Sequence, residues 1–139
     1  MRFHLSVELP DDLACLPRLR RTVRESLMLC QVCAEDIDTI ELLLGELATN
    51  AACHANAGHY LVNMEITDNS VILTVTDNGI GFQRDDVLPP VTLRSGVDGV
   101  DRIGGMGLPL VEMLADEVVF TSMKPQGTSV QAVKYINFR

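Results

Sequence analysis

Asp77 stands at the end of an alternating apolar run and is followed by Asn78, Gly79, Ile80 and Gly81. Glycines let a ligand approach the backbone closely. An ionised carboxylate only accepts hydrogen bonds, so its natural target is a donor such as the exocyclic amine of adenine. The Asn-Gly pair is equally typical of a hairpin turn, and this stretch alone leaves both interpretations open.

Glu46 and Asn50 form a second chemical pair, four residues apart in a run with helical periodicity. This spacing puts a carboxylate and a carboxamide on one helix face, at the border of the apolar stripe. A carboxylate in that place suits a catalytic base, and a carboxamide oxygen suits a ligand for Mg²⁺. A pair of solvated polar residues is the alternative.

A glycine-rich segment, residues 104–109, opens a third run with helical periodicity. The N–H groups and the dipole at the start of a helix attract anions such as phosphate. Because the formal net charge of the chain is −8, a polyphosphate site here would depend on such backbone donors and on a cation. Thr128, at the start of the last apolar run, offers a hydroxyl near the same pocket.

The elements that position these residues follow from the spacing of apolar side chains. Alternation predicts strands, and repeats of three to four residues predict helices. The expected order is a strand from Phe3 to Leu9, a helix from Pro17 to about Cys30, a helix from Glu35 to Ala55 or Asn56, strands His59–Ile66 and Val71–Thr76, a helix over Leu110–Asp116, and strands Glu117–Ser122 and Thr128–Ile136. The apolar stripes of the two long helices are Leu16, Leu19, Val23, Leu27 and Cys30, and Ile37, Ile40, Leu44, Leu47 and Ala51.

Residues 83–103 show no sustained periodicity and contain two prolines. A long segment without regular structure inside a compact domain is more often functional than accidental. We therefore predict a mobile lid over 83–103, with a disordered linker as the alternative.

Composition limits the function classes. A chain of 139 residues with 47% hydrophobic content suits a single domain over residues 1–139. The net charge argues against broad nucleic-acid binding. No apolar run is long enough to span a membrane, and we expect a cytoplasmic protein.

Two clusters leave alternatives open. Cys30 and Cys33 have the spacing of half a zinc site, but no second pair follows, so we expect reduced, packed thiols and no metal there. The arginines of the first helix form either a solvated face or a docking patch; they are Arg18, Arg20, Arg21 and Arg24.

Four segments together resemble the motifs of the GHKL ATPases. Residues 46–51 are similar to the N box, 77–81 to the G1 box, 105–108 to the G2 box, and Gly127-Thr128 to the final Gly-Thr. Their joint occurrence in the family's order favours a nucleotide pocket over the separate alternatives. The resemblance implies an α+β fold, the Bergerat ATP-binding fold, a two-layer α/β sandwich whose mixed, mostly antiparallel sheet is covered by helices on one face.

The resemblance also implies ligands and residue roles. ATP or ADP would bind with Mg²⁺, the adenine amine on Asp77 and the Mg²⁺ on Asn50. Glu46 would act as the general base, and Arg102 is the arginine nearest the glycine-rich turn. The remaining nucleotide-binding residues would be Gly79, Gly81, Gly105, Met106, Gly107, Leu108 and Thr128.

Within this family, the chain looks most like the small bacterial anti-sigma factors with serine-protein kinase activity. Only a strand and one helix precede Glu46, so we expect no phosphoacceptor hairpin of the sensor histidine kinase type. The branch implies a homodimer that binds a sigma factor and phosphorylates a STAS-type anti-anti-sigma protein. A non-catalytic, nucleotide-dependent switch is the alternative: the intact Glu46 favours the kinase, and the acidic composition of residues 83–103 favours the switch.

Overall fold

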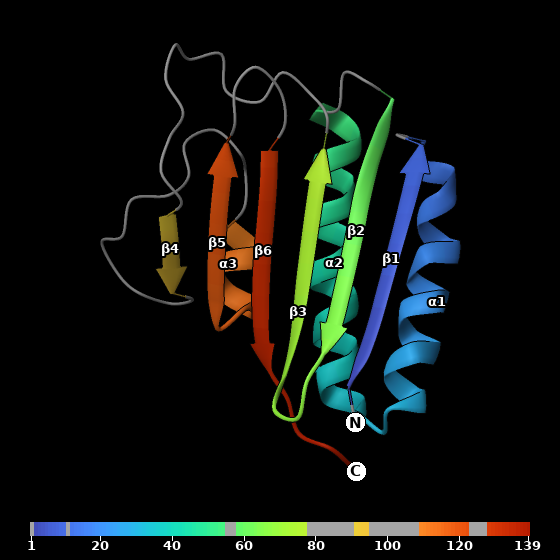
Figure 1. Ribbon diagram of the computed structural model, residues 1–139, viewed down its shortest axis with the longest axis vertical. Coiled ribbons are helices and arrows are strands. Elements are labelled where there is room, and N and C mark those ends of the chain that lie inside the picture. Colours follow the sequence, from blue (N-terminus) through green and yellow to red (C-terminus); the bar gives the residue numbers. More distant parts are fainter. Residues whose placement is uncertain (1, 11, 55–57, 78–90, 95–108, 123–127) are drawn as a thin grey trace.

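An antiparallel sheet with helices packed on one face forms the frame of the chain (Figure 1). The computed structural model describes residues 2–10, 12–54, 58–77, 91–94, 109–122 and 128–139. Within these ranges the helices lie behind the sheet and leave its other face uncovered (Figure 1). The predicted α+β, two-layer fold class is confirmed.

The sheet has six strands in the order β1-β2-β3-β6-β5-β4. All five pairings between them are antiparallel. The predicted sheet was mixed and mostly antiparallel, and the described strands contain no parallel pair. Burial alternates along β1, β2, β3 and β6, because every second side chain of a strand points toward the helices. The strands are β1 (Phe3–Pro10), β2 (His59–Ile66), β3 (Ser70–Asp77), β4 (Val91–Arg94), β5 (Glu117–Ser122) and β6 (Thr128–Tyr135).

The helices begin and end near the predicted residues. They are the short 3₁₀ helix η1 (Leu13–Cys15), α1 (Leu16–Leu29), α2 (Ala34–His54) and α3 (Pro109–Leu114). Pro17 lies in the first turn of α1, where its missing N–H costs nothing. Gln31 follows α1 with a φ of 63°, in the left-handed region, and this reversal brings the fully buried Val32 into the core.

The core lies between the sheet and the helices. Every predicted stripe residue of α1 and α2 is buried except Leu16, which is half-buried. The buried face of α2 is wider than predicted and includes Leu43 and Ala48. The reason is that α2 lies between α1 and α3 as well as against the sheet (Figure 1).

The prediction of a segment without regular structure over 83–103 is wrong at residues 91–94. Val91–Arg94 forms β4, which pairs with β5 at the sheet edge, Val91 opposite Phe120. Its Val-Thr-Leu sequence suits a strand, but a four-residue run is too short to stand out by periodicity. The rest of 83–103 lies outside the described residues.

The C-terminal segment is tied to the start of α2. Asn137 N donates to the buried Asp36 carboxylate at 2.7 Å, and Cys33 N donates to Asn137 O at 2.9 Å. Val32 and Phe138 form an isolated β-bridge beside these bonds. The chain end therefore closes the core at the turn between α1 and α2.

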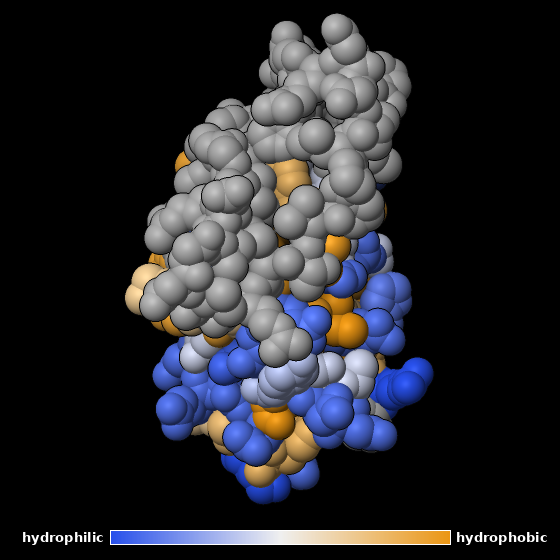
Figure 2. Space-filling model, turned by 90° about the vertical axis from the view of Figure 1, so that its left-hand side faces the viewer, coloured by the Kyte–Doolittle hydropathy of each residue, from blue (hydrophilic) through white to orange (hydrophobic). Residues whose placement is uncertain are grey.

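The described surface at the β4 end of the sheet is mainly hydrophilic in its lower half, with small apolar patches between the polar side chains (Figure 2). Met113 of α3 is 71% exposed. No helix in the described ranges has the length and apolarity to cross a membrane.

Candidate functional site

One row of residues crosses the sheet where β3 ends and β6 begins. Tyr60 pairs with Asp77, and Asp77 pairs with Thr128. Residues opposite one another in neighbouring strands carry their side chains on the same face. The exposed fractions are 1% for Tyr60, 4% for Asp77 and 4% for Thr128, so the row is buried. The two predicted adenine-binding residues, Asp77 and Thr128, are thus direct neighbours although 51 positions separate them in the sequence (128 − 77).

The burial of Asp77 has a chemical consequence. A carboxylate taken out of water is costly unless hydrogen-bond donors reach it. An acid retained at a buried strand end, beside a hydroxyl-bearing residue, is typical of a site that recognises a donor group. This arrangement fits the amine of an adenine ring.

Glu46 and Asn50 lie one turn apart on α2, and both are half-buried. Leu47 and Ala48 between them are buried, so the pair borders the core as predicted. α2 packs against β3, and the C-terminal half of α2 lies at the same end of the molecule as the end of β3 and the start of β6 (Figure 1). The fold therefore brings Glu46, Asn50, Asp77 and Thr128 to one end.

The other predicted site residues lie outside the described residues. They are Gly79, Gly81, Arg102, Gly105, Met106, Gly107 and Leu108. The described chain resumes at α3, whose first residue, Pro109, is the last residue of the glycine-rich segment. α3 packs against β5 and against α2, the helix that carries Glu46.

Tyr60 is the residue of the row that the sequence did not single out. Its hydroxyl is buried and has no hydrogen-bond partner among the described residues. Burial, and secondarily the nearby Cys15, raises the pKa of the Tyr60 phenol above its ordinary value. The alternation of apolar residues along β2 could have identified Tyr60 from the sequence, because it predicts that this side chain points toward the core beside the strand that ends in Asp77.

The oxygen-bearing side chains of the site indicate which kind of metal binding is feasible. Among the described residues, no three His, Cys, Asp or Glu side chains cluster as a metal site. The Asn50 carboxamide and the Glu46 carboxylate nevertheless present oxygen atoms, the ligand type that Mg²⁺ prefers when substrate phosphates complete its shell. These residues fit ATP with Mg²⁺ better than a protein-only metal cage.

Comparisons with known proteins agree with this geometry. The histidine kinase-like ATPase domain family matches residues 9–134, which include every candidate site residue. Serine-protein kinase RsbW of Staphylococcus epidermidis is 28% identical over 141 residues, covering 96% of this chain and 87% of the relative. Serine-protein kinase RsbW of Staphylococcus aureus (strain JH9) is 30% identical over 109 residues, covering 73% of this chain and 67% of the relative.

Proposed function

The chain belongs to the histidine kinase-like ATPase domain family, and we propose that it is an ATP-binding anti-sigma regulator that phosphorylates an anti-anti-sigma protein on serine. Family membership implies ATP binding, usually with Mg²⁺. The pairing of the buried Asp77 with Thr128, inside the matched region, is the structural observation that carries the proposal. The serine-protein kinase names of relatives aligned over most of this chain support the activity.

The nucleotide end of the site is assigned to the buried row. Asp77 accepts a hydrogen bond from the adenine amine, and Thr128 supports it with its hydroxyl. Gly79 and Gly81 leave room for the ring beside the backbone. The N–H groups of residues 105–108, Gly105 to Leu108, donate to the phosphates.

The transfer end of the site is assigned to α2. When bound, ATP supplies the phosphoryl group and Mg²⁺ the charge that neutralises the phosphates. Asn50 holds the Mg²⁺, and Glu46 accepts the proton of the partner's serine hydroxyl. Arg102 donates to the terminal phosphate.

The proposal includes the partners of this branch. A sigma factor and a STAS-type anti-anti-sigma protein compete for the protein, which acts as a homodimer. Because transcription takes place in the bacterial cytoplasm, the proposal also implies a cytoplasmic protein.

A non-catalytic switch is the second candidate. The aspartates of residues 83–103 outnumber the arginines, so that segment neutralises little phosphate charge; they are Asp85, Asp86, Asp98 and Asp101, against Arg84, Arg94 and Arg102. In a switch, ATP would bind and change partner affinity without any transfer.

Phosphotransfer to purified candidate anti-anti-sigma proteins separates the two functions. The protein is mixed with Mg²⁺ and ATP labelled on the γ-phosphate, and label on serine is measured. We expect transfer by the wild type and about 10²–10⁴-fold slower transfer by Glu46→Ala, because a base used only in the reaction contributes mainly to the rate. Glu46→Ala should keep its ATP affinity, whereas Asn50→Ala should lose affinity as well as rate.

Glu35→Ala is the matched control, since Glu35 is an exposed acid in the first turn of the same helix. It should transfer at the wild-type rate. If Glu46→Ala also does so, the assignment of the base is wrong. If the wild type binds its partners and ATP but transfers nothing, the switch replaces the kinase.

A further inference from the structure

Tyr60 carries a hydroxyl that the fold leaves without a hydrogen bond. Its oxygen is buried and has no partner in the part of the chain that the structure describes. A buried tyrosine hydroxyl ordinarily finds a partner, because an unsatisfied polar group inside a protein is costly. A phenylalanine would fill the same space without that cost. The Tyr60 hydroxyl therefore indicates a partner from outside the chain.

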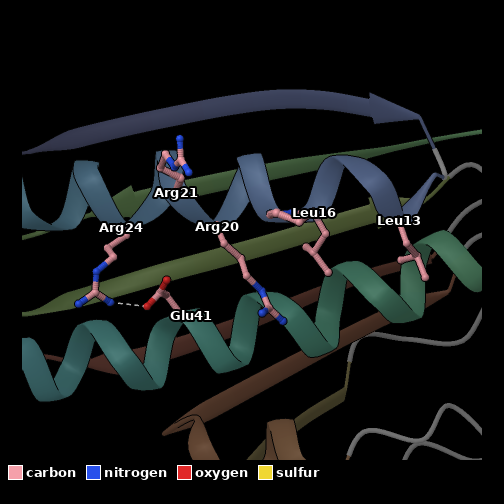
Figure 3. Close-up of a pocket in the computed structure, with 7 residues that line it drawn as sticks. Leu13, Leu16, Arg20, Arg21, Arg24 and Glu41 are labelled. Carbon is pink, nitrogen blue, oxygen red and sulfur yellow. Dashed lines mark hydrogen bonds and ion pairs between the residues drawn. The ribbon is translucent and has the colours of Figure 1, made fainter.

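The start of α1 fixes the surroundings of this hydroxyl. Cys15, at the end of η1, is the nearby group that adds to the effect of burial in raising the pKa of Tyr60. A thiol is a weak acceptor, and the two groups form no hydrogen bond. The next residue, Leu16, extends toward α2, and further along α1 Arg24 donates to Glu41 of α2 (Figure 3). Because α1 is held on α2 at these points, a shift of α1 that would give Tyr60 a partner is unfavourable.

Tyr60 lies on the side of Asp77 opposite to Thr128. The strand order β2-β3-β6 puts the three residues in one row across the sheet. Neighbouring strands are about 5 Å apart, and paired residues carry their side chains on one face. The row therefore has two hydroxyl groups, which can donate hydrogen bonds, with a carboxylate between them, which accepts them.

Adenine presents the complementary order of groups. Its exocyclic amine donates, and the ring nitrogens N1 and N7, one on each side of the amine, accept. With the amine on Asp77, the two hydroxyls of the row face opposite ring nitrogens. N7 belongs to the five-membered ring that bears the ribose, and it therefore lies toward the phosphates, which are assigned to Asn50 of α2. Since α2 packs mainly on β3 and β2, Tyr60 lies on the N7 side and Thr128 on the N1 side.

We propose that Tyr60 is a specificity-determining residue of the nucleotide site, and that its hydroxyl donates to N7 of adenine through a bridging water. The inference rests on the proposed function and adds a second group that recognises the base beside Asp77. The water has the Tyr60 hydroxyl, the Asp77 carboxylate and N7 as partners, and ordered buried waters typically make about three hydrogen bonds. The same hydroxyl therefore costs stability in the free protein and contributes affinity in the complex.

7-Deaza-ATP tests the proposal, because a C–H group replaces N7 while the amine that faces Asp77 is kept. Calorimetry measures the affinities of the full chain for ATP and for 7-deaza-ATP, each with Mg²⁺. We expect the wild type to bind 7-deaza-ATP about three- to tenfold more weakly than ATP, the range for one neutral hydrogen bond. Tyr60→Phe should bind ATP about as weakly as the wild type binds 7-deaza-ATP, and it should no longer distinguish the two nucleotides.

Two controls separate recognition of N7 from general damage to the pocket. Thr128→Val removes the hydroxyl on the other side of Asp77, so it should weaken both nucleotides and keep the ratio of their affinities at the wild-type value. Thr76→Val removes a hydroxyl one residue before Asp77, on the opposite face of the sheet, where it donates to Ser129 Oγ at 3.1 Å. It should leave both affinities within about twofold of the wild type.

The thermal midpoint gives a readout that needs no enzymatic activity. Without nucleotide, Tyr60→Phe should melt at the temperature of the wild type or above it, because it lacks the unsatisfied hydroxyl. ATP should raise the midpoint of Tyr60→Phe less than it raises that of the wild type, since stabilisation by a ligand follows its affinity. A merely structural role of Tyr60 would lower the midpoint of the free variant and leave the ratio of the two affinities unchanged.

Each result decides for or against a role of the hydroxyl in recognising the base. Equal affinities of the wild type for ATP and 7-deaza-ATP would overturn the inference and leave the proposed function in place. A folded Tyr60→Phe protein that still prefers ATP by the wild-type ratio would do the same. A wild type that binds neither nucleotide would overturn the proposed function, and this inference with it.

Discussion

At the scale of single residues, the buried row at the end of β3 concentrates the chemistry. Asp77 has Tyr60 on one side and Thr128 on the other, and all three are nearly inaccessible to water. In such surroundings each polar atom needs a partner, so the identity of each side chain matters more than at the surface. Substitution of Asp77 therefore tests ligand binding, and substitution of Tyr60 tests the stability of the fold.

Asp77→Asn tests the adenine acceptor. The amide keeps the shape of the carboxylate but lacks its charge, and losing a charged hydrogen bond costs about 1.5–3 kcal/mol. We expect ATP and ADP affinities to fall about ten- to a hundred-fold in calorimetry. Unchanged nucleotide affinity in a folded Asp77→Asn protein would contradict the pocket assignment.

Tyr60→Phe removes a buried hydroxyl that has no partner in the described part of the chain. An unsatisfied buried polar group is unfavourable, so the variant should be as stable as the wild type or more stable by about 1 kcal/mol in urea unfolding. A destabilisation of about 1 kcal/mol or more would instead mean that the hydroxyl is hydrogen-bonded.

The pH dependence of the unfolding free energy distinguishes the wild type from Tyr60→Phe in a second way. Because burial raises the pKa of Tyr60 in the folded state, the unfolded chain loses its phenolic proton first. The stability from this group is therefore complete below the unfolded pKa of about 10 and is lost as the pH rises through the higher folded value. Tyr60→Phe should therefore lose less stability than the wild type between about pH 9 and pH 11, as measured by urea unfolding at each pH.

At the scale of elements, α2 connects the functional parts. Its first turn holds the C-terminal segment through Asp36, its middle carries Gly45 under Arg20 and the adjacent Glu46, and Asn50 follows one turn later. The helix is buried against the sheet and against both neighbouring helices.

Asp36→Ala tests the tie at the start of α2. The Asp36 carboxylate is 8% exposed and accepts hydrogen bonds from Asn137 N at 2.7 Å and from Cys33 Sγ at 3.0 Å. Its removal leaves these donors without an acceptor and should lower the free energy of unfolding by about 1–3 kcal/mol. Glu35→Ala, at an exposed acid in the same first turn, should change little in the same urea titration; equal effects of both substitutions would rule out a special role for Asp36.

At the scale of the whole molecule, the sheet has a long edge at β1. The helix-facing side of this strand is apolar and half-buried through Phe3, Leu5, Val7 and Leu9, and its other side is exposed. Its outer backbone groups have no neighbouring strand in the described sheet. Such an edge can pair with a second copy of the chain.

We therefore predict a homodimer, in keeping with the proposed branch of the family. Light scattering at micromolar concentration should give twice the 15.2 kDa of the chain. Dilution should shift the mass toward that of the monomer if exchange is reversible. A mass of one chain at every concentration would count against the prediction.

The local pattern of the sequence determined the elements, and the resemblance to the GHKL ATPases implied the fold class. Alternation and helical repeats act over a few residues, so β2 and β5 were predicted with their observed bounds, and both long helices to within a few residues. The resemblance to a known family implied that Asp77 and Thr128 serve one pocket, but it did not predict that they pair directly across β3 and β6. The short strand β4 was missed because a few residues paired at an edge carry little periodic signal.

Only the tertiary structure decided which distant side chains meet. Arg20 and Gly45 are both unremarkable in their own helices, and their contact exists because α1 and α2 pack side by side. Tyr60 lies beside Asp77 because of the register of β2 on β3, and Asp36 receives Asn137 because the chain end returns to the start of α2. Each of these contacts joins segments that no short sequence window contains, and each depends on register and packing angle, which are properties of the whole core.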